Sequence, residues 1–320
     1  MVTKLPGALT DLLADAPTNW GKWGPDDQVG SLNYLTPAEV LRALGSVRSG
    51  RLFTLMLELG NPKGDPLWPG RVPYAHFMTQ DRGTYETGKT PAIQGGLEYA
   101  DDVILVACHG STHTDALGHT WYDNRAWNGF SADASKGGLE NCSVLPLAQK
   151  GIVGHAVLLD VARYRGVPYL PMHSQVSLDD LLGAAKAQKV ELQKHDILVV
   201  RTGILKAFYE KGQAEFYKDF DEPGLTYDKR LLEFFHDMEI PVSATDILAG
   251  EMLTSATAEA VFPLHAALSR NLGVVFIEAH WLEEWAEDCV TDGKYDGLYM
   301  ASPLKIRYGT ASPVNPIVIK

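Results

Sequence analysis

The sequence predicts an α/β or α+β fold built on a mixed sheet. Apolar runs of strand length recur at 102–107, 151–161, 195–202 and 274–278. Amphipathic segments with helix start signals lie between some of these runs. Strands and helices do not alternate in a strict βαβ rhythm, so a mixed sheet fits the pattern better than a purely parallel one.

The chain opens with an irregular segment. Residues 1–30 are punctuated by proline and glycine and carry Trp20 and Trp23. We expect an N-terminal arm whose aromatic rings dock on the body or on a partner subunit. A single domain over 31–320 is expected to follow it.

The next elements are a helix, a strand and a long loop. Thr36 followed by Pro37, with a glutamate three residues after the threonine, is a helix start signal, and the apolar spacing up to residue 47 is helical. Residues 51–59 predict a strand. Residues 60–100 are rich in glycine and proline and predict a loop with short strands, and such long loops are often functional. A buried strand is predicted over 102–107.

The second half of the chain alternates strands and helices. The strands over 151–161 and 195–202 flank a helix over 177–189, which Ser177 caps. The remaining predictions are helices over 231–238 and 263–271 and strands over 241–245, 274–278, 304–308 and 316–319.

The composition excludes several classes of protein. The 320 residues carry a formal net charge of -12, and an acidic surface repels phosphates, so nucleic acid and anionic membranes are poor partners. No apolar run approaches the ~20 residues that a membrane-spanning helix needs. Cys108, Cys142 and Cys289 form no CxxC pair, and the N-terminus does not resemble a secretory signal. We therefore expect free thiols in a cytoplasmic protein.

One short stretch, HGSTHTDALGH at 109–119, gathers His109, His113, Asp115 and His119 within eleven residues. Imidazole and carboxylate are the ligands that zinc and manganese bind. A straight strand would hold His109 about 13 Å from His113, too far for one ion. We therefore expect a turn over 109–113 and an extended pair at 113–115. His119 is either a fourth ligand or a free base beside the ion.

This stretch resembles the signature His-x-Gly-Thr-His-x-Asp-x-Pro-x-His of the cyclase family, which contains the bacterial kynurenine formamidases and the isatin hydrolases. Here Ser111 stands in the usual glycine position and Leu117 where proline is common, while the histidines and the aspartate are all present. The similarity extends over most of the chain, through the segments 23–43, 151–167, 196–203, 245–246 and 303–319.

The resemblance implies a mixed, β-barrel-like sheet with helices outside, and one or two zinc or manganese ions. It makes His109, His113 and Asp115 metal ligands and His119 the general acid/base. His265 and Glu278 complete the site, with Glu278 also counted as catalytic. A carboxylate at the end of the apolar run 274–277 needs a partner; the alternative is an ion pair with an arginine such as Arg201.

Four further side chains are candidates for contacting a substrate. Trp68 and His76 lie in the long loop, Trp121 follows His119 closely, and His280 comes just after Glu278. For each of them the alternative is ordinary packing or exposure at the surface.

The resemblance and the ligand set favour a metal-dependent hydrolase of a C–N amide bond in a small molecule. The substrate would be an aryl formamide such as N-formylkynurenine, or a cyclic amide or imide. Ala279 and His280 follow Glu278 where the formamidases usually have Asn-Leu, which weakens the case for N-formylkynurenine itself. The alternatives are a cyclase or dehydratase that uses the same ion, and a metal-dependent binding protein without turnover. A homo-oligomer is expected.

Overall fold

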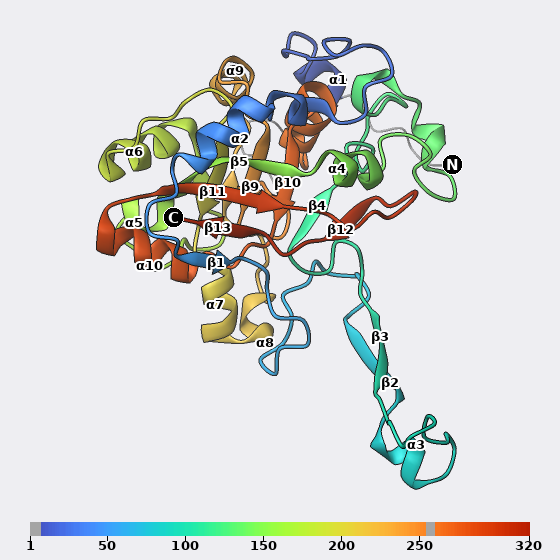
Figure 1. Cartoon of the computed structure of the whole chain (residues 1–320). Coiled ribbons are helices and arrows are strands. Elements are labelled where there is room, and N and C mark those ends of the chain that lie inside the picture. The colour runs from blue at the N-terminus through green and yellow to red at the C-terminus, as the bar shows by residue number, and fades with distance from the viewer. Residues whose placement is uncertain (1–7, 254–259) are drawn as a thin grey trace.

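The computed structural model describes residues 8–253 and 260–320, and one nine-stranded sheet forms its centre (Figure 1). The strands of this sheet are β1 Leu52–Thr54, β4 His113–Asp115, β5 Ile152–Asp160, β7 Ile197–Arg201, β9 Val242–Thr245, β10 Val275–Glu278, β11 Asp296–Ala301, β12 Ala311–Pro313 and β13 Ile317–Ile319. Their spatial order is β1-β13-β11-β5-β7-β9-β10-β4-β12. β5, β7, β9 and β10 run parallel and the outer strands pair antiparallel, which confirms the predicted mixed sheet.

Helices cover this sheet, and two small strand pairs lie outside it. The α-helices are α1 Ala8–Leu12, α2 Pro37–Leu44, α3 Arg82–Glu86, α4 Val144–Lys150, α5 Val161–Tyr164, α6 Leu178–Gln188, α7 Ile204–Lys211, α8 Gln213–Phe216, α9 Lys229–Asp237 and α10 Glu283–Asp292. Three short 3-10 helices are η1 Gly30–Tyr34, η2 Trp127–Gly129 and η3 Ala132–Ser135, and η4 His265–Leu272 is a π-helix. The pairs are β2 Ala75–Gln80 with β3 Asp101–Leu105, and β6 Gln175–Val176 with β8 Gly224–Leu225.

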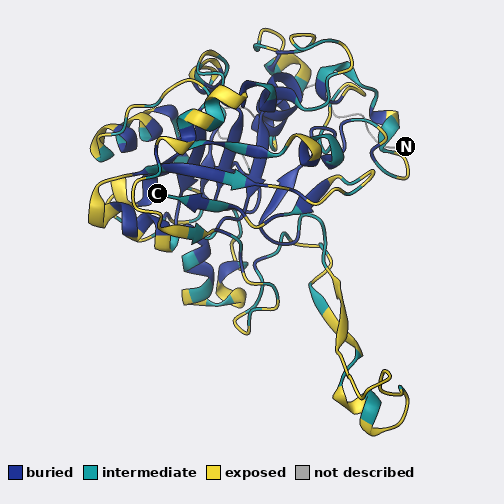
Figure 2. Ribbon diagram, in the orientation of Figure 1, coloured by how far each residue is buried: buried dark blue, intermediate teal, exposed yellow. Residues whose placement is uncertain are grey.

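Alternate residues of the central strands enter two different cores. Val157 and Leu159 of β5 pack in the core beneath α6, α9 and η4. Leu158 points the other way, into a core that contains Trp127 and Trp285. The sheet curls around this second core, so the barrel-like sheet with helices outside is confirmed (Figures 1 and 2).

Elements with a clear local signal form as predicted. Ser177 caps α6 in a full capping box: its hydroxyl accepts from the Asp180 N–H, and the Asp180 carboxylate accepts from the Ser177 N–H. The predicted strands over 151–161 and 195–202 are β5 and β7, both with continuous apolar cores. The helix predicted over 263–271 corresponds to the π-helix η4. It ends at Gly273, which has the left-handed conformation.

Two predicted strands are corrected by the structure. The run over 102–107 is a strand, β3, but it is exposed rather than buried, because it pairs only with β2 in a hairpin that leaves the body. Residues 304–308 form no strand; the Leu304 N–H donates to the Ser312 hydroxyl instead, and the sheet is continued by β12. The strand predicted over 51–59 is limited to β1.

Within the described residues of the N-terminal segment, which begin at residue 8, the aromatic side chains pack on the body of their own chain. The Trp20 indole donates to the Arg270 carbonyl (2.8 Å), and the Arg270 guanidinium lies 4.3 Å from the Trp20 ring. Trp23 packs edge-on against Tyr34 with 5.0 Å between ring centroids. Among the helices of the described residues, none has the length and apolar character that a membrane crossing requires.

Candidate metal centre

The pairing of β4 with β10 builds the middle of the site. Glu278 lies directly opposite His113 in this antiparallel pair, and opposite residues point to the same face of a sheet. The His113 Nε2 atom lies 3.2 Å from Glu278 Oε2 and 3.4 Å from Asp115 Oδ1. Asp115 shares this face because it is two residues along the strand from His113.

A turn before β4 adds His109. The Gly110 N–H donates to the Ala107 carbonyl, and a Cβ on Gly110 would come within 2.9 Å of that oxygen, so the turn requires glycine there. His109 Nδ1 lies 2.8 Å from Asp115 Oδ1, and the His109 and His113 rings are 4.9 Å apart. The predicted turn followed by an extended pair is confirmed.

His265 enters the same space from the first residue of η4. Its Nε2 atom lies 3.7 Å from Asp115 Oδ2 and 3.6 Å from Glu278 Oε1. The Glu251 carboxylate holds the other side of the ring, accepting from His265 Nδ1 (2.7 Å), from the His265 N–H (2.6 Å) and from the Leu264 N–H (2.8 Å). The ring packs 4.6 Å from that of Phe276.

The predicted meeting of His265 and Glu278 with the first cluster is therefore confirmed. Two sets of donor atoms, His109/His113/Asp115 and Asp115/His265/Glu278, each lie within 4.8 Å of one another and share Asp115. Arg201, the alternative partner for Glu278, instead binds Asp160 (2.8 Å) and Glu283.

Unpaired buried atoms indicate that this cluster fits a cation. Four buried atoms of this cluster make no hydrogen bond of suitable geometry to a described residue, although the first and third lie only 2.8 Å apart: His109 Nδ1, His113 Nε2, Asp115 Oδ1 and Glu278 Oε1. His113 Nδ1 donates to the Ser111 carbonyl (2.7 Å), so Nε2 is the ring nitrogen that faces the carboxylate oxygens. Imidazole nitrogens and carboxylate oxygens that converge in a buried space are the ligands that a divalent ion accepts.

The electrostatics agree with this fit. Burial opposes a charge on His113, but the nearby carboxylates of Asp115 and Glu278 outweigh it and raise the pKa of the ring to about 9. Burial likewise opposes the charge of Asp115, yet the nearby His119 and His109 hold the pKa of its carboxyl well below the ordinary value. The cluster thus attracts positive charge, whether protons or a metal ion.

His119 lies beside the cluster and belongs to neither set of donors. Its ring is 4.1 Å from that of His109. Burial, together with the His109 and His265 rings, lowers the pKa of His119 to about 4 even though Asp115 and Glu278 oppose the shift. The ring is therefore neutral at pH 7 and able to accept a proton.

Of the four residues predicted to contact a substrate, Trp68 has contacts that lead to the cluster. Its ring packs edge-on against Phe262 (5.6 Å) and Phe220 (5.4 Å), and Phe262 packs against His265 (5.5 Å). Together these rings form an aromatic wall beside the donor atoms.

The other three have different surroundings. His76 is on β2, in the hairpin, where its Nε2 pairs with Asp102 (2.7 Å). Trp121 is 47% exposed. His280 is fully buried, with Nδ1 bonded to the Thr245 carbonyl and Nε2 to the Tyr299 hydroxyl, so it packs in the core and offers no free nitrogen to a substrate.

Three residues around the cluster had no signal in the sequence. Glu251 orients His265, as described above. The Arg71 guanidinium donates to the His109 carbonyl (2.6 Å). Glu222 is fully buried, and burial together with the charge of Glu278 raises the pKa of its carboxyl well above the ordinary value, although its bond from the Leu248 N–H opposes the shift. Each is identified only by a contact between distant parts of the chain.

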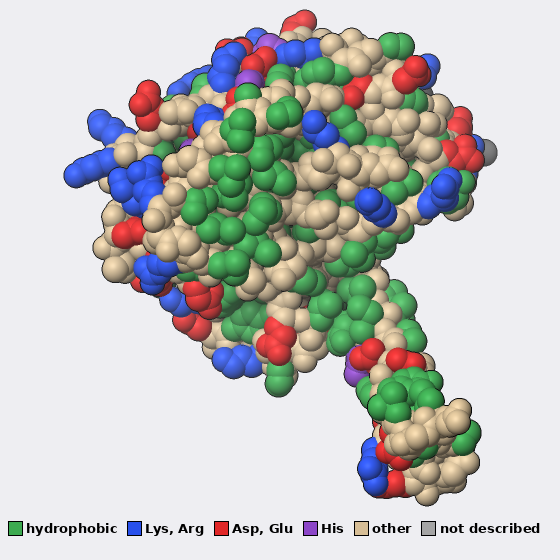
Figure 3. Space-filling model, in the orientation of Figure 1, with side chains coloured by type: hydrophobic (Ala, Val, Ile, Leu, Met, Phe, Trp, Pro, Cys, Tyr) green, Lys and Arg blue, Asp and Glu red, His purple; other side chains and the backbone are tan. Residues whose placement is uncertain are grey.

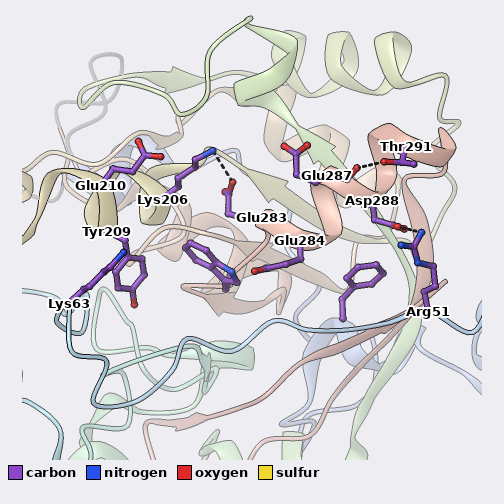
Figure 4. A pocket seen from close by; sticks show the side chains of 12 residues that line it. Arg51, Lys63, Lys206, Tyr209, Glu210, Glu283, Glu284, Glu287, Asp288 and Thr291 are labelled. Atoms are coloured by element: carbon purple, nitrogen blue, oxygen red, sulfur yellow. Dashed lines mark hydrogen bonds and ion pairs between the residues drawn. The ribbon is translucent and has the colours of Figure 1, made fainter.

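A separate surface hollow of about 790 Å³ lies between α7 and α10 (Figure 4). Ion pairs across it, Lys206 with Glu283 and Arg51 with Asp288, neutralise much of its charge. Tyr209 and Trp281 add apolar surface. Its lining differs from the donor cluster, so the metal centre is not part of this hollow.

Comparison with known proteins places these features in a family. The family model described as "Putative cyclase" matches residues 55–252. The solved structure of a novel cyclase is 33% identical, covers 95% of this chain and 100% of its own, and superposes with a TM-score of 0.86. No curated protein matches the chain.

Two isatin hydrolases share the fold at lower identity. One, bound to the product analogue thioisatinate, is 20% identical over 91% of this chain and 98% of its own, with a TM-score of 0.58. Isatin hydrolase A from Ralstonia solanacearum is 17% identical over 89% and 95%, with a TM-score of 0.60. At these identities the likeness concerns the fold alone.

Proposed function

Because the chain belongs to the cyclase family, we propose that it is a metal-dependent hydrolase of a C–N amide bond in a small molecule. The observation that carries the proposal is the set of four buried, unpaired donor atoms that face one another on β4, β10 and the turn before β4. A binding site of this composition has no evident structural purpose, since it costs stability without an ion.

The ion would be held by His109, His113, Asp115, His265 and Glu278. Zinc and manganese both accept imidazole and carboxylate ligands, and Asp115, common to both donor sets, would be shared if two ions bind. A bound divalent ion supplies Lewis acidity, which lowers the pKa of water and polarises a carbonyl group.

His119 is the residue we assign to proton transfer. It is neutral at pH 7 because its pKa is lowered to about 4, and it lies beside the donor atoms without belonging to them. It would take a proton from the attacking water and deliver it to the leaving nitrogen as the C–N bond breaks. Glu278 would orient His113 and His265 from the opposite side.

The aromatic wall of Trp68, Phe220 and Phe262 favours a substrate with an aryl or fused ring. An aryl formamide and a cyclic amide such as isatin both satisfy this requirement. The isatin hydrolases among the fold relatives make the cyclic amide the first compound to test.

The test combines metal analysis with turnover. We expect the purified protein to contain a divalent ion and to open isatin or release formate from N-formylkynurenine, with the product identified by absorbance and mass spectrometry. Chelation should abolish turnover and one added ion should restore it. Full activity in a preparation free of metal would refute the proposal. A ring-closed product would favour the cyclase, and saturable binding without product would favour the binding protein.

A further inference from the structure

Trp68 and Arg71 are the first and last residues of a β-turn beside the metal centre. The Arg71 N–H donates to the Trp68 carbonyl (3.1 Å), and Gly70 between them has a left-handed φ of 90°. Pro69 precedes this glycine, and proline at the second position with glycine at the third is typical of a type II turn. The backbone of the turn therefore fixes the positions from which the two side chains extend.

The two ends of this turn contact different donor sets of the metal centre. The Trp68 ring packs against Phe262, which packs against His265 of one donor set. The Arg71 Nη1 atom donates to the carbonyl of His109, which belongs to the other donor set (2.6 Å). The turn thus extends along the donor atoms, with an aromatic ring at one end and a positive charge at the other.

Most N–H groups of the Arg71 guanidinium have no partner among the described residues. A guanidinium carries five such donors, and the bond to the His109 carbonyl uses one of them. Other partly buried arginines of the chain contact a carboxylate, as Arg42 contacts Asp196 and Arg201 contacts Asp160, but residues 8–253 and 260–320 provide none for Arg71. Its planar fork is therefore able to bind a carboxylate that a ligand brings.

The charge of the whole molecule gives this cation a purpose. The chain carries a formal net charge of -12, and acidic side chains are spread over the face of the molecule that Figure 3 shows. Such a surface repels anionic ligands in general. A fixed guanidinium beside the donor atoms offsets this repulsion where an anionic substrate would bind.

We propose that Arg71 binds a carboxylate of the substrate, so that the enzyme prefers aryl amides that carry a negative charge close to the ring. This inference rests on the function proposed above and specifies the class of substrate. The ring would lie against Trp68, the amide would face the donor atoms, and the carboxylate would pair with the guanidinium. The alternative is that Arg71 acts only by positioning His109.

The first experiment measures binding without turnover. 2-Aminobenzoate and 2-aminobenzamide have the same ring and nearly the same shape, but only the first is an anion. Their fluorescence reports binding to the protein at saturating zinc. We expect the natural protein to bind 2-aminobenzoate at least tenfold more tightly, the usual effect of hydrogen bonds to a charged group. Arg71→Met should remove this preference, and Arg71→Lys, which keeps the charge but not the fork, should retain part of it.

The second experiment measures hydrolysis of 2-formamidobenzoate and of its neutral methyl ester, again at saturating zinc. A displaced His109 or a lower metal content slows both reactions by the same factor, so the ratio of the two kcat/KM values reports recognition of the charge alone. We expect a ratio above ten for the natural protein and about one for Arg71→Met. Arg48→Met, at an exposed position after α2, is the matched control and should leave the ratio unchanged.

The outcomes separate this inference from the proposed function. If neither formamide is hydrolysed but 2-aminobenzoate binding depends on Arg71, the hydrolase proposal fails and the anion site stands. Equal binding of the two probes by the natural protein, or a preference that persists in Arg71→Met, would overturn the inference. An unchanged kcat/KM ratio in Arg71→Met would do the same, and Arg71 would then act only through His109.

Discussion

Glu251 is the residue on which the orientation of His265 depends. Its carboxylate accepts both the ring Nδ1–H and the backbone N–H of His265, which leaves Nε2 as the free acceptor toward Asp115 and Glu278. Gly250 next to it has a left-handed φ of 63° and approaches Glu278 so closely that a Cβ would lie 2.8 Å from its oxygen. This corner of the site is thus fixed by backbone as well as by side chains.

Glu251→Gln should weaken metal binding by 10–100-fold, the usual effect of removing a partner that orients a ligand. The amide still accepts one hydrogen bond, so the fold should persist. Competition with a chromogenic chelator measures the affinity without any substrate. Glu284→Gln, on the exposed side of α10, is the control. If both variants bind metal like the natural protein, Glu251 has no positioning role.

His119→Ala should retain the metal and lose turnover by ~10²–10⁴-fold, the range expected for general acid–base catalysis. The reason is that His119 lies beside the donor sets but outside them. Metal content is measured by elemental analysis and turnover by the isatin assay, with His113→Ala as the comparison. Equal loss of metal in the two variants would make His119 a ligand.

At the residue scale, the sequence is most informative where several side chains that can bind a metal lie close together in the chain. Four candidate groups within eleven residues predict the first half of the site from the sequence alone. His280 was misjudged because Ala279 adopts a left-handed φ of 56°, which ends the alternation of β10 and turns His280 into the core, where its N–H bonds the Thr245 carbonyl. No spacing rule anticipates such a reversal.

Among the elements, β5 carries a charged side chain, His155, from which we expect an effect on stability. His155 lies between Asp196 (2.8 Å) and Asp296 (3.2 Å). Burial and the neighbouring Arg42 disfavour its charge, but the two carboxylates outweigh them and raise the pKa of the ring to about 9. The protonated ring therefore joins β5 to the loop before β7 and to β11.

His155→Gln should reduce the free energy of unfolding by about 2 kcal/mol at pH 6. A pKa that is raised on folding stabilises fully below the unfolded value of about 6.5, and this stabilisation is lost as the pH rises through about 9. Urea unfolding of both proteins at pH 6 and pH 10 tests the sign: the difference should shrink at pH 10. A difference that grows with pH would contradict it.

Prediction of elements succeeded where one segment carries its own signal. α6 has its cap and β5 and β7 have long apolar runs, so the local pattern sufficed. The run over 102–107 has the same composition, but its strand stays exposed because it pairs only with β2 and not with the main sheet. The position of β12 depends on pairing with β4, which is a tertiary contact and leaves no local pattern.

At the scale of the whole molecule, the order of the strands in the sheet brings together residues that lie far apart in the chain. β10 and β4 are separated by more than 150 residues but pair directly, and this brings Glu278 opposite His113. The sequence could suggest this meeting through the family resemblance and the need of a buried carboxylate for a partner. The pairing that achieves it became evident only from the topology.

The hairpin of β2 and β3 and the metal centre are also joined at this scale. Arg71 precedes β2 and donates to the carbonyl of His109, which follows β3 by four residues. Both ends of the hairpin thus meet at a proposed metal ligand.

Arg71→Met should therefore weaken metal binding by about tenfold, the lower end of the effect of removing a group that orients a ligand. The methionine keeps most of the side-chain volume but cannot donate to the His109 carbonyl. Competition with a chromogenic chelator measures the affinity without any substrate. An affinity equal to that of the natural protein would show that this bond does not position His109.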